Sequence, residues 1–116
     1  MSWLKTALSE KGRIRHNMLR YRKLTKKLDA IKRILFATQS NAYFMVREVL
    51  EDTLVKANKD IASRLSFLIK GENGQKTVLD SPQKSAQIIE QIKLLINEKI
   101  RKEKLKLRDD NESWKL

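Results

Sequence analysis

The chain has 116 residues, of which none is cysteine, one is proline and three are glycine. Without cysteine it forms neither disulfides nor thiolate metal sites. Its apolar runs are only a few residues long, far below the ~20 residues needed to cross a bilayer. No apolar segment of the kind found in secretory signal peptides follows the start. These absences predict a protein without a membrane span, and we expect it in the cytoplasm.

Residues suited to catalysis are equally scarce. The one histidine, His16, has no neighbouring acid in the sequence, so we expect it to face solvent or a phosphate. Glu48, Glu51 and Asp52 fall within one helical turn and offer oxygens to a hard cation, but an ordinary solvated acidic face explains them as well. The segment 71–74 lacks the glycine spacing and Lys-Ser/Thr ending of a phosphate-binding loop. We therefore predict no enzyme activity, no metal, no cofactor and no small-molecule substrate.

Apolar residues recur at helical spacing in three stretches, which predicts an all-α, single-domain protein. We expect a three-helix bundle with a long antiparallel hairpin and helices over 13–38, 42–69 and 82–108. The third helix begins at Ser81-Pro82, a combination typical of helix starts. A short helical segment, 1–12, would begin at Ser2 and close at Gly12. Residues 70–81 form a loop, and 109–116 form a frayed tail.

Each expected helix has one apolar face. In the first helix the spacing from Tyr21 onward resembles a heptad repeat, so Tyr21 is expected in the core rather than stacked on a base. The residues expected on this face are Ile14, Met18, Tyr21, Leu24, Leu28, Ile31 and Leu35 in the first helix, Val46, Val49, Leu50, Leu54, Ala57, Ile61, Leu65 and Leu68 in the second, and Ile88, Ile89, Ile92, Leu95, Ile96 and Ile100 in the third.

Positive charge is concentrated at one end of the chain. Of the formal net charge of +12, residues 1–35 carry 11 basic and 2 acidic side chains, a net of +9, while residues 36–80 carry 6 of each. Glu48, Asp52 and Asp60 of the second helix are expected to neutralise part of this charge. A basic helix face is typical of polyanion binding, and arginine suits bidentate phosphate contact. The candidate nucleic-acid-binding residues are Arg13, Arg15, Arg20, Arg22, Lys23, Lys26, Lys27 and Arg33.

These features predict a non-enzymatic protein that binds the phosphate backbone of DNA or RNA. Few Asn or Gln residues accompany the cations, so we expect sequence-tolerant, salt-sensitive binding. In size, charge and helical make-up the chain resembles the small helical subunits of CRISPR effector complexes, and plasmid or phage DNA-handling accessory proteins fit equally. The resemblance implies an accessory subunit of a nucleoprotein assembly. The segment 60–65 also resembles the first helix of a helix-turn-helix, but the required turn does not follow it.

A second hypothesis is a helical chaperone or assembly factor that docks an acidic partner protein. The heptad-like face from Tyr21 to Leu35 and the long helix beyond Ile100 favour it, since both suit pairing with a partner helix. A protein partner or self-association is expected in either case. A membrane surface is a third possible polyanion, although only Trp3 and Leu4 supply the apolar residues that it needs.

Overall fold

The computed structural model describes residues 2–37, 41–71 and 77–113. The exposure of side chains is described for residues 10–37, 41–71 and 77–108. These residues form α-helices and one short 3-10 helix and contain no strand, which confirms the all-α class. The elements are α1 (Ser2–Ala37), α2 (Ala42–Leu50), α3 (Thr53–Ala57), α4 (Lys59–Lys70), the 3-10 helix η2 (Val78–Asp80) and α5 (Pro82–Ser113).

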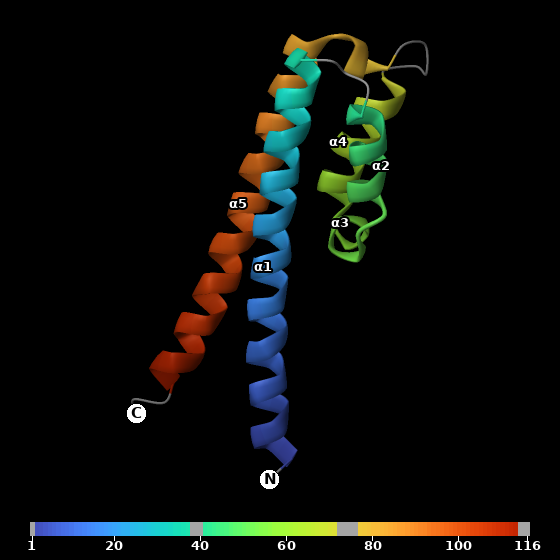
Figure 1. Ribbon diagram of the computed structural model, residues 1–116. Helices are drawn as coiled ribbons and strands as arrows, with labels where there is room; N and C mark the ends of the chain where they lie inside the picture. The colour runs from blue at the N-terminus through green and yellow to red at the C-terminus, as the bar shows by residue number, and fades with distance from the viewer. Residues whose placement is uncertain (1, 38–40, 72–76, 114–116) are drawn as a thin grey trace.

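The helices run alternately up and down along one long axis (Figure 1). Helix α2 returns antiparallel to α1, α4 runs back beside α2, and α5 descends along α1. Helices α2, α3 and α4 lie beside only part of this pair, and α1 and α5 continue past α3 toward the termini. The molecule measures 56 × 22 × 20 Å. Its length is that of α1, because an α-helix of this size rises ~1.5 Å per residue to ~54 Å.

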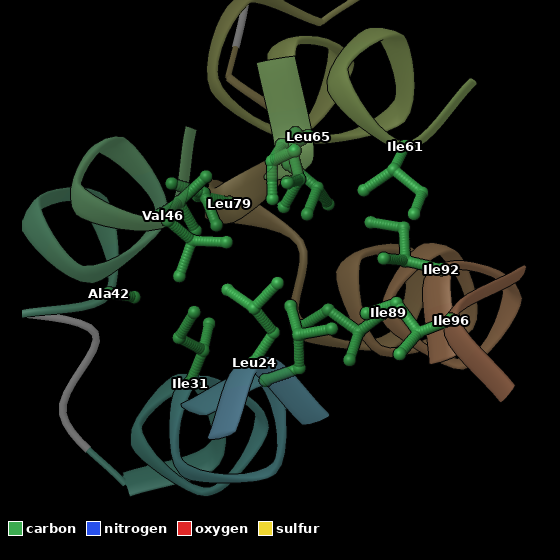
Figure 2. Close-up of a cluster of buried hydrophobic side chains, with 14 of the residues drawn as sticks. Leu24, Ile31, Ala42, Val46, Ile61, Leu65, Leu79, Ile89, Ile92 and Ile96 are labelled. Carbon is green, nitrogen blue, oxygen red and sulfur yellow. The ribbon is translucent and has the colours of Figure 1, made fainter. Parts of the chain in front are cut away.

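Helices α1, α2, α4 and α5, with Val55 of the short α3, surround the hydrophobic core, where three helices were expected. Figure 2 shows apolar side chains of α1, α2, α4 and α5 pointing toward one another, with Leu79 of η2 closing one side. Leu28, Ile61, Leu65 and Ile92 are fully buried there. All seven apolar residues expected on the first helix are buried, from Ile14 to Leu35, and Tyr21 is a core residue as expected.

The prediction of one continuous helix over 42–69 was wrong, because two polar residues cap new helices inside it. The Asp52 carboxylate accepts a hydrogen bond from Leu54 N at 2.9 Å and starts α3. The Asn58 side chain accepts from Ile61 N at 3.1 Å and starts α4. Such caps compensate the free N–H groups of a helix start. The breaks also change the buried face, so that Val55 is buried where Ala57 was expected.

The predicted boundary at Gly12 was also wrong, since α1 runs through it without interruption. A glycine inside a helix costs only ~1 kcal/mol relative to alanine, and helix-forming residues flank this one on both sides. At the other end, α5 begins at Pro82 as expected but extends to Ser113, beyond the predicted end at residue 108. None of the described helices is long and apolar enough to cross a membrane.

Ion pairs define the register between the antiparallel helices α1 and α5. Lys93 Nζ lies 2.6 Å from Asp29 Oδ1, and Lys32 Nζ lies 2.9 Å from Glu90 Oε1. Each pair joins one residue of α1 to one of α5. Together with the packing contacts between α1 and α5, these pairs fix how the two helices lie beside each other around Asp29 and Lys32.

Candidate nucleic-acid interface

All eight candidate binding residues lie on α1, and the structure divides them into two groups by exposure. Arg20 and Lys27 are half-buried. The other six side chains are exposed: Arg13, Arg15, Arg22, Lys23, Lys26 and Arg33. The division follows the direction in which each side chain leaves the helix, because α2 and α3 cover one side of α1 and α5 covers another.

The two half-buried cations, Arg20 and Lys27, form ion pairs toward α2 and α3. Arg20 Nη2 lies 2.5 Å from Asp52 Oδ1 and donates to Thr53 Oγ1 at 2.9 Å. Lys27 Nζ lies 2.6 Å from Glu48 Oε1. Two of the three acids expected to neutralise the basic helix thus do so, whereas no ion pair joins Asp60 to α1 in the described part of the chain. Arg20 and Lys27 tie α1 to its neighbours and are poor candidates for ligand contact.

Four of the exposed cations form a line along α1. Arg15, Arg22, Lys26 and Arg33 follow one another at steps of seven, four and seven residues. At 3.6 residues per turn these positions lie within about 40° of one another around the helix axis. We call Arg15, Arg22, Lys26 and Arg33 the outer row. None of them forms an ion pair with a described residue.

The remaining two exposed candidates lie off this line. Lys23 follows Arg22 and also forms no ion pair within the described residues, so it adds charge beside the outer row. Arg13 is 3.9 Å from Glu10, and both side chains are well exposed. Exposed pairs at this distance contribute little, so the Arg13 guanidinium stays accessible to another anion. His16 is exposed and lines a shallow hollow with Lys23 and Lys27.

A second hollow contains a residue that the sequence did not single out. Lys26, Asp29, Lys32, Arg33 and Phe36 line it together, on the side of α1 toward α5. The Phe36 side chain is 59% exposed, although a phenylalanine is normally covered. The signal was present in the sequence, because Phe36 falls outside the apolar face of its helix and lies three residues after Arg33.

The acid that lines this hollow, Asp29, and the nearby Glu90 are each paired with a lysine. The hydrogen bond from Lys32 lowers the pKa of Glu90 below its ordinary 4.5. The hydrogen bond to Asp29 raises the pKa of Lys93 above its ordinary 10.5. Both shifts favour the charged forms of Glu90 and Lys93, and Asp29 has a cation of α5 beside it. The excess charge at the hollow is then that of Lys26 and Arg33.

One acid lies in the contact between α1 and α5 without full compensation. Glu103 is mostly buried, and its Oε2 has no hydrogen-bond partner among the described residues. Its Oε1 lies 4.0 Å from Lys106 Nζ. Burial, and next the negative charge of Glu103, raise the pKa of Tyr21 above its ordinary 10.0. Tyr21 therefore stays neutral at physiological pH.

The outer row supplies fixed positive charges suited to binding anions, and the described residues contain no group of three His, Asp or Glu side chains able to hold a metal ion. Comparison of the chain with protein-family models, with curated proteins and with solved structures finds no match.

Proposed function

We propose that this protein binds nucleic acid through phosphate contacts along α1, without sequence selection and without catalysis, as a small subunit or accessory factor of a nucleoprotein assembly. The outer row carries the argument. The two half-buried cations of α1, Arg20 and Lys27, each have an acidic partner, whereas the outer row has none within the described residues. A fold selected only for stability has no need of four adjacent unpaired cations, because like charges repel.

The composition of the outer row favours backbone contact over base reading. It consists of Arg and Lys alone, and in the described part of α1 neither Gln nor Asn lies beside the row. Asn and Gln are the side chains that pair with adenine, whereas Arg and Lys suit phosphates, which carry no sequence information.

A direct test removes the outer row and keeps the paired cations. The variant R15Q/R22Q/K26Q/R33Q lowers the formal net charge from +12 to +8, since four charges are lost. Binding is measured by fluorescence anisotropy with labelled DNA and RNA across a salt series. Each lost phosphate contact should reduce the slope of log K against log salt by about 1, so we expect the slope to fall by about 4. Affinity at moderate salt should fall on the order of 100-fold.

The matched control removes the same charge elsewhere. K56Q/K59Q/K70Q/K84Q also lowers the net charge to +8, and these four lysines are exposed residues outside α1. The control should bind within about threefold of the unmodified protein, a small difference in free energy. Equal losses in both variants would show that only total charge matters. An unmodified protein that binds no nucleic acid at low salt would end the proposal.

One observation favours the second candidate, a helical assembly factor with an acidic protein partner. Leu19 and Leu94 are 56% and 69% exposed, and Leu19 lies on α1 between Arg15 and Arg22. An acidic amphipathic helix would use both the leucines and the cations. Such binding buries apolar surface and therefore changes little with salt. Leu19→Ser would weaken it strongly and leave phosphate binding unchanged.

A further inference from the structure

We infer that the nucleic acid bound along the outer row is single-stranded and that Phe36 stacks on one of its bases. This inference rests on the proposed function and specifies that the bound nucleic acid is a single strand rather than a duplex. It starts from the hollow lined by Lys26, Asp29, Lys32, Arg33 and Phe36. There an exposed aromatic ring lies beside two cations of the outer row, Lys26 and Arg33.

The hollow offers a base and its phosphate different partners. The Phe36 ring is 59% exposed, so its surface is open to a flat ligand. Arg33 and Phe36 are three residues apart on α1, which makes them neighbours on the helix surface. A phosphate on Arg33 therefore places the attached base within reach of the ring. Proteins that bind single strands without sequence preference combine a cationic track with aromatic stacking in this way.

The acids around the hollow do not oppose such a ligand. Asp29 is 2.6 Å from Lys93, and Glu90 is 2.9 Å from Lys32. These contacts pair both carboxylates with cations, so their negative charge is offset where a phosphate would approach. Lys26 and Arg33 have no such partner among the described residues. The hollow is thus net positive despite containing an acid.

A duplex does not satisfy both parts of the site. Its bases are stacked on one another, so no base face is available to Phe36 without unpairing, which costs a few kcal/mol. The outer row also runs along the axis of one uninterrupted helix, α1, whereas the phosphates of a duplex wind around the duplex axis. A flexible single strand can follow a straight row and extend a base to its end.

A second exposed phenylalanine provides a matched control. Phe44 of α2 is 70% exposed, more than Phe36, but it does not line the hollow. Its neighbour Tyr43 meets it edge to face, with ring centroids 6.2 Å apart, and Arg47 lies 5.8 Å from the centroid of the Tyr43 ring. Loss of the Phe44 ring therefore tests exposed aromatic surface in general.

The experiment compares three labelled probes with the full chain and its variants. The probes are a single strand of about 20 nucleotides, longer than typical single-strand sites, an abasic strand of the same length, and the corresponding duplex. Phe36→Leu should weaken binding of the ordinary strand on the order of 10-fold and leave the abasic strand and the duplex within about twofold. Phe36→Tyr should bind like the unmodified protein, and Phe44→Leu should change nothing. A ribonucleotide strand run in parallel shows whether the sugar matters.

Several outcomes would overturn the inference while leaving the proposed function in place. These are a duplex that binds as tightly as the single strand, a Phe36→Leu variant that binds the ordinary strand normally, or an equal loss on ordinary and abasic strands. The last result would mean that the substitution disturbs the cations rather than a stacked base. If the unmodified protein binds none of the probes, the proposed function itself fails.

Discussion

The two sides of α1 carry the same residue types in different electrostatic settings. Toward α2 and α3, Arg20 and Lys27 each meet a carboxylate. On the outer side, Arg22 is two residues from Arg20 and Lys26 is next to Lys27, but neither Arg22 nor Lys26 meets a carboxylate within the described residues. The role of a cation on this helix therefore follows from the direction of its side chain. Only one or two residues along the chain separate a cation in an ion pair from one that has no partner among the described residues.

The largest expected effect is on the paired side. Asp52 both caps α3 through Leu54 N and accepts the Arg20 guanidinium. Asp52→Ala removes a cap worth about 1 kcal/mol and a partly exposed ion pair worth somewhat less, so unfolding should become easier by about 1.5–2 kcal/mol. Urea denaturation measures the change. Glu51→Ala, at an exposed neighbouring acid, is the control and should stay within about 0.5 kcal/mol of the unmodified protein.

A pair of single substitutions separates stability from binding. Arg20→Gln loses contacts to Asp52 and Thr53 and should destabilise the fold by about 1 kcal/mol while leaving nucleic-acid affinity within about threefold. Arg22→Gln should leave stability unchanged and reduce the salt slope by about 1. Urea denaturation measures the stability of each variant, and fluorescence anisotropy measures its affinity for nucleic acid. The two sides of α1 would not differ in function if both substitutions weakened binding equally.

Glu103 marks a third side of α1, the contact with α5. Its Oε2 is buried without a partner in the part of the chain that the structure describes, so Glu103→Leu should stabilise the protein by about 1 kcal/mol. The pKa of Tyr21 should fall but stay above its ordinary 10.0, because burial contributes more to its rise than Glu103 does. A raised tyrosine pKa makes stability decline as pH rises above 10.0, and this decline should be smaller in the variant. Absorbance titration of the phenolate, with Tyr21→Phe as reference, measures the shift.

The smallest effect concerns the continuity of α1. Gly12 lies inside the helix, and a Cβ placed there meets nothing within 4 Å. Gly12→Ala should therefore stabilise the protein by about 0.5–1 kcal/mol and leave nucleic-acid binding unchanged. A melting temperature that falls instead would indicate that α1 bends at this glycine in solution. Gly71→Ala gives the opposite sign, because Gly71 ends α4 with φ 68° and ψ −179°, a conformation that side chains resist.

The sequence predicted the helical class and the buried side of α1, because seven apolar residues at heptad-like spacing define a single apolar face of a helix. It did not predict the breaks at Asp52 and Asn58. In a sequence, a polar residue on the solvated side of a continuous helix cannot be told from a residue that caps a new helix. The difference lies in the path of the backbone, which the sequence alone does not give. For the same reason it grouped Arg20 with Arg22. Their separation depends on where α3 begins, which is a property of tertiary packing.

The spacing of the outer row also has a consequence for ligand length. Arg15 and Arg33 are 18 residues apart on one uninterrupted helix, about 27 Å at the rise of an α-helix. An oligonucleotide must therefore span about that distance to contact Arg15 and Arg33 at the same time. Shortening the strand below this length should remove contacts one by one, so affinity would fall in steps whose number counts the cations that are used.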